Sequence, residues 1–108
     1  MTDHGGRAGD ADAVLRRMLA PALTEAESSL EGAPPGSPER SRLAALLAAA
    51  AEDAQQALGD RAREPRLHRI VGAAASTSMA LALGDGLVAD ADVRARLREG
   101  LELLAAGS

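Results

Sequence analysis

The feature of this 108-residue chain that most constrains its fold is the complete absence of Phe, Tyr and Trp. A core without aromatic rings must be filled by Leu, Val, Met and the very frequent Ala. Burying one Leu side chain contributes only about 1.5–3 kcal/mol, and small domains have little stability to spare. We therefore expect either helices that approach one another closely through Ala, or a core that a second copy or a partner protein completes.

Apolar residues recur at the three- and four-residue spacing of amphipathic helices in four segments. These segments are residues 10–31, 38–59, 65–83 and 90–106. Asp10 or Asp12 is a candidate N-cap for the first segment, and Asp90 or Asp92 for the fourth. Pro21 predicts a kink in the first helix, or its division into two shorter helices. Short connections and the near absence of strand patterns predict an all-α, antiparallel four-helix bundle.

The ends of the second segment and the extent of the domain are marked by local signals. Ser37 followed by Pro38 predicts an N-cap and the first helical residue, and Gly59 predicts the helix end. Residues 1–9 are rich in Gly and polar side chains and have no periodicity, so we expect a disordered tail there. Residues 10–106 then form one helical domain.

Composition argues against several classes of function. Without cysteine there is no disulfide and no thiolate, and two histidines, His4 and His68, are too few for a usual zinc site. A net charge of −4 and the lack of stacking aromatics argue against nucleic-acid binding. No apolar run approaches the ~20 residues that span a bilayer, and the polar N-terminus does not resemble a signal peptide. We expect a cytoplasmic protein without a metal, a cofactor, or a nucleic-acid or membrane partner.

A specific chemistry is best argued for the stretch LHRIVGAAAS, residues 67–76. On a helical wheel a buried stripe is formed by Leu67, Ile70, Val71, Ala74, Ser78 and Leu81. His68 lies at the border of this stripe, with Gly72, Ala75 and Met79 beside it. A histidine that carries a phosphoryl group needs an exposed imidazole, small neighbours and a rigid helix. The pattern around His68 is compatible with all three.

The same residues resemble a known family. HRIVGAAAS is similar to the helix of histidine-containing phosphotransfer domains, with Val71 where that family has Lys; the matching residues are His68, Ile70, Gly72, Ala73 and Ala74. LHRIVGAAAS also resembles the dimerisation and phosphotransfer helix of histidine kinases, with Arg69 in place of an acidic residue; here Leu67, His68, Val71, Gly72 and Ser76 match. The resemblance implies a phosphoryl acceptor or donor rather than a kinase. It makes His68 the catalytic residue, Arg69 an aid to the phosphate, and a response-regulator receiver domain the partner.

A second resemblance concerns ASTSMALAL, residues 75–83. This stretch is similar to the phosphopantetheine attachment segment of acyl and peptidyl carrier proteins, with Ser78 as the attachment site. Thr77 replaces the usual Asp, and Ala75 replaces the usual Gly. The competing interpretation is that small polar residues let neighbouring helices pack closely.

Two further stretches are interpreted as ordinary surface. The arginines of RAREPR, residues 61–66, are either a solvated loop and first turn or a docking site for an acidic group. GDG, residues 84–86, is too short for a calcium loop and predicts a turn.

The function favoured by these observations is a non-catalytic helical interaction or regulatory module. It would present an apolar, Ala-rich helix face to a partner protein or to a second copy, with Arg69, Gly72, Ala75 and Met79 as docking residues. Phosphotransfer through His68 and a carrier role for Ser78 remain the alternatives.

Overall fold

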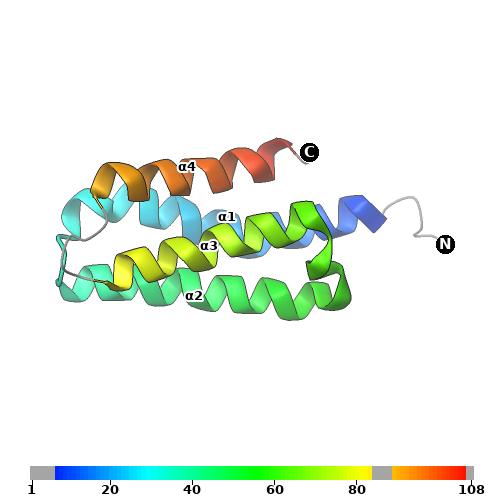
Figure 1. Ribbon diagram of the computed structural model, residues 1–108, viewed down its shortest axis with the longest axis horizontal. Coiled ribbons are helices and arrows are strands. Elements are labelled where there is room, and N and C mark those ends of the chain that lie inside the picture. The colour runs from blue at the N-terminus through cyan, green and yellow to red at the C-terminus, as the bar shows by residue number, and fades with distance from the viewer. Residues whose placement is uncertain (1–6, 84–88, 107–108) are drawn as a thin grey trace.

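The computed structural model describes residues 7–83 and 89–106, which form four α-helices and two short 3-10 helices. The elements are α1 (Arg7–Ser29), η1 (Leu30–Gly32), α2 (Pro38–Leu58), η2 (Gly59–Arg63), α3 (Pro65–Ala82) and α4 (Asp90–Ala106). Successive helices run in opposite directions, and the described part contains no strand (Figure 1). The predicted all-α, antiparallel four-helix bundle is confirmed.

Each helix packs mainly against two others. α1 and α3 both contact α2 and α4, whereas α1 and α3 touch each other only slightly. The four helices therefore lie at the corners of a square, with neighbours in sequence side by side and α4 closing the ring against α1. None of the helices in the described ranges is both long enough and apolar enough to cross a membrane.

The start of α1 differs from the prediction. The helix begins at Arg7, so residues 7–9 of the predicted tail are helical, while residues 1–6, including His4, lie outside the described residues. Asp12 lies inside the helix and is not an N-cap: its carboxylate pairs with the guanidinium of Arg66 on α3. The tertiary ion pair accounts for this aspartate, which the sequence pattern alone assigned to a helix end.

Pro21 does not divide α1, which continues as one helix to Ser29. Proline removes one backbone hydrogen bond from a helix interior. Pro21 is exposed, whereas Leu19 and Leu23 on either side of it are fully buried. The packing of these leucines on the core holds the helical path through the proline.

The ends of α2 are as predicted. The Ser37 hydroxyl accepts a hydrogen bond from the backbone N–H of Arg40 at 3.1 Å, with Pro38 as the first helical residue. Gly59 ends the helix with a positive φ of 58°, which a residue with a Cβ adopts only with strain.

The core is built of aliphatic side chains, mostly Leu and Ala. Its largest fully buried apolar members are Leu15, Leu19, Leu23, Leu30, Leu43, Leu47, Ile70, Leu81, Val93 and Leu97. The contact between α1 and α4 is especially close, because a Cβ added at Gly100 would lie 3.2 Å from Leu23 Cδ1. Small residues thus permit the close helix packing that a core without aromatic rings requires.

A buried arginine, which sequence analysis did not single out, joins three segments at one end of the bundle. Only 2% of Arg40 is exposed. Its Nη1 donates to the Ala33 carbonyl at 3.0 Å, and its Nη2 lies 3.0 Å from the Asp90 carboxylate. Asp90 is the first residue of α4, so it lies within the first turn rather than preceding the helix as a cap.

Candidate functional site

Helix α3 has the two faces that its sequence predicts. Every member of the predicted stripe is buried, namely Leu67, Ile70, Val71, Ala74, Ser78 and Leu81. His68, Gly72, Ala75 and Met79 are all exposed. The prediction that His68 lies at the border of the buried stripe is therefore confirmed in position and exposure.

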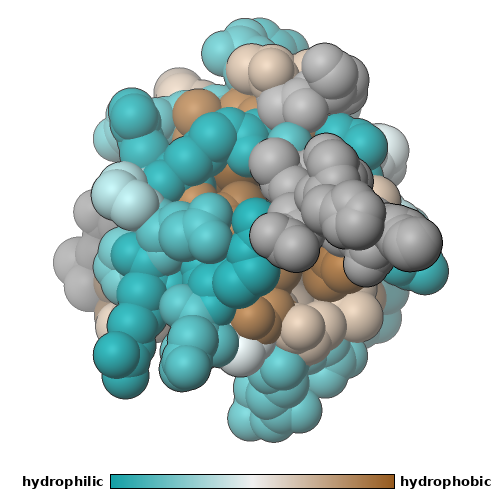
Figure 2. Space-filling model, turned by 90° about the vertical axis from the view of Figure 1, so that its right-hand side faces the viewer, coloured by the Kyte–Doolittle hydropathy of each residue, from teal (hydrophilic) through white to brown (hydrophobic). Residues whose placement is uncertain are grey.

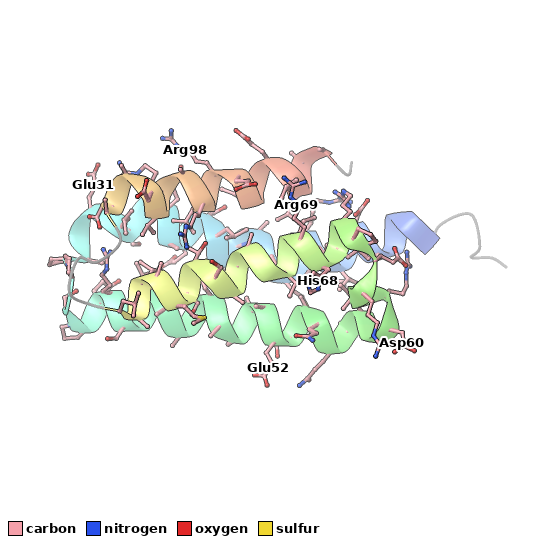
Figure 3. The ribbon with its side chains drawn as sticks, viewed as in Figure 1. Glu31, Glu52, Asp60, His68, Arg69 and Arg98 are labelled. Atoms are coloured by element: carbon pink, nitrogen blue, oxygen red, sulfur yellow. The ribbon has the colours of Figure 1, made fainter. Side chains whose placement is uncertain are left out.

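His68 lies on the edge of α3 that is turned toward α2 (Figure 3). Its backbone N–H donates to the Glu64 carbonyl at 2.8 Å, which makes it part of the first turns of α3. The imidazole is one wall of a surface cavity of about 130 Å³. The cavity is lined by Gln55, Ala62, His68, Val71, Gly72 and Ala75. It combines an apolar floor with two polar side chains, the Gln55 amide and the His68 imidazole.

The approach to this cavity is open. A Cβ added at Gly72 would meet no atom within 4 Å, and Ala75 is exposed one turn further along α3. A partner helix or loop can therefore come close to the backbone of α3 next to the imidazole. Such clearance is what the sequence pattern of His68, Gly72 and Ala75 was expected to provide.

Two of the predicted docking residues lie outside the cavity. Arg69 lies on the edge of α3 turned toward α4 (Figure 3), and its Nη2 is 3.6 Å from Glu99 Oε2. The side chain of Met79 is 70% exposed and belongs to the same side of α3 as His68, three turns further along. Leu83, at the end of α3, is 51% exposed. Arg69 is therefore directed away from the imidazole, and Met79 and Leu83 extend the exposed apolar surface.

The environment of Ser78 argues against the carrier-protein interpretation. Ser78 is buried, and its hydroxyl donates to the Ala44 carbonyl of α2 at 2.6 Å. Thr77 is also buried and donates to the carbonyl of Ala73, one turn earlier. An attachment serine must be reached by a transferase, whereas this hydroxyl joins two helices. The Ser78 hydroxyl thus serves the close packing of the competing interpretation, whereas the Thr77 hydroxyl bonds a carbonyl of its own helix.

The arginines of residues 61–66 are part of a solvated end of the bundle. Arg61 Nε lies 3.0 Å from Glu64 Oε2, and Arg66 pairs with Asp12 and donates to the Leu103 carbonyl at 2.7 Å. Figure 2 looks onto this end, where hydrophilic side chains surround smaller areas of apolar surface. Arg66 thereby joins α1, α3 and the last turn of α4. GDG, residues 84–86, lies outside the described residues.

Charged pairs connect the helices on the other sides of the bundle. Arg42 of α2 lies 2.9 Å from Glu25 of α1 and also hydrogen-bonds Glu39. Arg98 of α4 lies 2.8 Å from Glu27 of α1. The hydrogen bond from Arg42 lowers the pKa of the Glu39 carboxyl, and bonding to Glu39 and Glu25 raises the pKa of Arg42.

The side formed by α2 and α3 differs from the others. Within residues 7–83 and 89–106, no ion pair joins α2 to α3. Gln55 lines the cavity, and Ala48, seven residues earlier on the same side of α2, is exposed, whereas Glu52 points away from α3 (Figure 3). We name as the α2–α3 face the exposed residues Ala48, Gln55, His68, Gly72, Ala75, Met79 and Leu83. None of these residues carries a permanent charge.

Sequence analysis found the α3 half of this face and missed the α2 half. Gln55, which the sequence analysis did not single out, is exposed and lines the cavity beside His68. The signal in the sequence was Ala48, a small residue seven positions before Gln55 and therefore on the same side of the helix. In a chain so rich in Ala, that signal cannot be separated from the average composition until the helices are placed side by side.

The described side chains include no cluster of three or more His, Asp or Glu that could hold a metal ion. In comparisons with known proteins, no protein-family model matches this chain, and no curated protein and no solved structure is significantly similar to it.

Proposed function

We propose that this chain is a non-catalytic docking module that binds another protein surface through the α2–α3 face. The observation that carries the proposal is the chemistry of this face. It lacks the ion pairs that connect helices on the other sides of the bundle, and it exposes Met79, Leu83 and small residues instead.

Physical considerations favour a binding role for such a surface. An exposed Met contributes binding free energy when a partner removes it from water, at about 25 cal/mol per Å² of apolar area. Small residues allow a partner backbone to approach closely, and methionine adapts its shape to the surface that it meets. The cavity beside His68 has room for one partner side chain, and its two polar groups offer hydrogen bonds at its rim.

Site-specific photocrosslinking tests this proposal. The photoreactive residue benzoylphenylalanine replaces Met79 in the full chain, produced in the cells from which the protein comes. A matched variant carries it at Glu102, an exposed position on α4. We expect a discrete covalent adduct from position 79 and none from position 102. The absence of any adduct specific to position 79 would contradict the docking function.

A second candidate function is phosphoryl transfer through His68. The observation that favours it is an exposed imidazole beside an open cavity, with clearance above Gly72. In the transfer step an imidazole nitrogen attacks phosphorus, the bond between phosphorus and the leaving oxygen breaks, and the ring loses one proton to water. The Gln55 amide lines the same cavity and is a candidate hydrogen-bond donor to the phosphoryl oxygens.

Incubation with acetyl phosphate tests this second function, with mass spectrometry and phosphorus NMR as readouts. We expect one phosphoryl group on the wild type, bound through an acid-labile N–P bond, and acetate as the released product. His68→Gln should remove it, whereas His4→Gln should retain it. If wild type gains no phosphoryl group, or if His68→Gln still gains one, His68 is not a phosphoryl acceptor.

A further inference from the structure

We propose that the surface beneath α4 is a binding site for an amphipathic helix of another protein, and that α4 is its displaceable internal ligand. We name this surface the α4 groove; residues that contact α4 there are Leu23, Glu27, Glu31, Arg69 and Ser76. The groove shares no residue with the α2–α3 face, so this inference goes beyond the proposed docking function and does not depend on it.

The apolar anchoring of α4 is the weakest of the four helices. α4 packs on α1 and α3 (Figure 1), and its buried residues are Val93, Leu97, Gly100 and Leu104. These are four residues, against eight in each of α2 and α3. Gly100 has no side chain, so three large apolar side chains hold α4 on the core. A segment with few buried apolar contacts opens more readily than the rest of a fold.

Polar contacts supply much of the remaining hold on α4, along both of its sides and at both ends. These contacts are Asp90 with Arg40, Arg94 with Glu31, Arg96 with Ser76, Arg98 with Glu27, Glu99 with Arg69, and the Leu103 carbonyl with Arg66. Most of these groups are exposed, so water can replace their contacts when α4 leaves. α4 is therefore the helix that detaches at the lowest cost.

Two of these ion pairs define the charge pattern of the helix that the groove accepts. Arg98 Nε lies 2.8 Å from Glu27 Oε2, and Arg94 Nη2 lies 3.6 Å from Glu31 Oε2. The acidic groups are four residues apart, and so are the basic groups, with the order reversed because the helices are antiparallel. Arg69 lies on the opposite rim of the groove. A helix that enters must place two basic side chains, four residues apart, toward the acidic rim.

The groove also selects for a small residue at one position. A Cβ added at Gly100 would lie 3.2 Å from Leu23 Cδ1, so the helices approach closely there. Counted from Val93, α4 has apolar residues at the first, fifth and twelfth positions, glycine at the eighth, and arginine at the second and sixth. Recognition of a helix in a groove uses apolar anchors at such spacing. This pattern is the signature of the partner helix.

The connection of α4 to the same chain makes the site closed in the absence of a partner. A helix supplied by another molecule competes with an internal ligand whose effective concentration is high. Binding therefore requires that α4 detaches first, and a partner that matches the pattern more closely than α4 does can replace it.

Native-state hydrogen exchange of the full chain, followed by NMR, tests whether α4 detaches while the rest stays folded. Arg42→Gln removes a pair between α1 and α2, and Arg98→Gln removes a pair between α1 and α4. Each should speed exchange of the α2 core amides by about two- to five-fold, because global unfolding breaks both pairs. Only Arg98→Gln should also speed exchange of the α4 amides. If Arg42→Gln speeds the α4 amides by the same factor as the α2 amides, α4 opens only when the whole chain unfolds, and the proposal is overturned.

A charge exchange between the full chain and a fluorescent peptide of residues 89–106 tests the groove itself. The variant Glu27→Arg/Glu31→Arg should bind its own α4 less tightly, because like charges then face each other. It should bind the peptide carrying Arg94→Glu/Arg98→Glu at least about ten-fold more tightly than the unchanged peptide, as measured by fluorescence anisotropy. Far-UV circular dichroism should show that this surface variant keeps its helices.

A third peptide, carrying Ala91→Glu/Ala95→Glu, is the control for non-specific attraction. Both positions are exposed on α4 and are four residues apart. This peptide should bind the charge-reversed chain within about two-fold of the unchanged peptide. If no peptide binds, or if all three bind equally, the groove is not a site for a helix of this pattern. Neither result affects the docking function, because crosslinking at position 79 does not involve the α4 groove.

Discussion

At the scale of single residues, the buried Arg40 is the clearest departure from a simple apolar core. Its guanidinium bridges the Ala33 carbonyl, at the end of the α1–α2 connection, and Asp90, at the start of α4. Its Nε is buried without a hydrogen-bond partner within the described part of the chain. A buried charge is strongly destabilising when one partner is removed, yet replacement by an apolar residue of similar volume is often tolerated.

Substitution of Arg40 tests this bridge. Arg40→Ala removes the hydrogen bond to Ala33 and leaves a cavity, so the free energy of unfolding should fall by about 3 kcal/mol. Arg40→Met fills the space without a charge and should cost at least about 1 kcal/mol less. Urea denaturation followed by far-UV circular dichroism measures both. If both variants lose the same free energy of unfolding, the volume of the side chain at position 40 does not contribute to stability.

The pH dependence at Glu39 can also be stated from its contacts. The hydrogen bond from Arg42 lowers the pKa of Glu39 below its ordinary value of 4.5. The ionised pair therefore stabilises the fold above the unfolded-state pKa, and this contribution is lost as the pH falls through the lowered value. In Arg42→Gln the pKa of Glu39, followed by carboxyl-carbon NMR, should rise toward 4.5. In the control Arg98→Gln it should stay lowered. Because both side chains are exposed, the change in stability should be small.

At the scale of helices, two interior glycines have opposite surroundings. Gly72 of α3 has open space where a Cβ would lie, whereas a Cβ at Gly100 of α4 would lie 3.2 Å from Leu23 Cδ1. Both glycines lower the helix propensity of their segment. The first leaves the surface of α3 open, and the second lets α1 and α4 pack closely.

Alanine at the two glycines should therefore give different results. Gly72→Ala should raise the free energy of unfolding by about 0.5–1 kcal/mol, since it gains helix propensity without a clash. Gly100→Ala gains the same propensity, but Leu23 must move, so it should be less stable than Gly72→Ala by about 1 kcal/mol. Thermal unfolding of the two variants measures this difference. If both variants gain the same free energy of unfolding, the close approach of α1 and α4 at Gly100 does not require a glycine.

At the scale of the whole molecule, a second copy or a partner that binds only the folded state would stabilise it by mass action. With a second copy on the α2–α3 face, the melting temperature of the wild type should rise with protein concentration once the concentration exceeds the dissociation constant. Met79→Glu should melt at a temperature that does not depend on concentration over the same range. Differential scanning calorimetry measures this difference, and a wild type whose melting temperature does not change with concentration would mean that the docking partner is not a second copy.

The helices were predictable from the sequence because their signals are local. Apolar spacing predicted all four helices, and Ser37, Pro38 and Gly59 predicted the ends of α2. The predicted start of α1 was wrong: the helix begins at Arg7, and Asp12, a candidate N-cap, lies inside it and pairs with Arg66. That α1 continues as one helix through Pro21 also depends on the buried leucines beside it, and the helix-breaking preference of proline alone would not predict it.

The sequence by itself determined the all-α class, the faces of α3 and the position of His68 at the border of its buried stripe. A helical period of 3.6 residues is enough to assign these. Only the tertiary structure decided that Gln55 completes the cavity, that Ser78 is bonded to α2, that Arg69 turns toward α4, and that Arg40 is buried. Each of these depends on which residues of another helix lie alongside, and spacing within one helix carries no information about its neighbours.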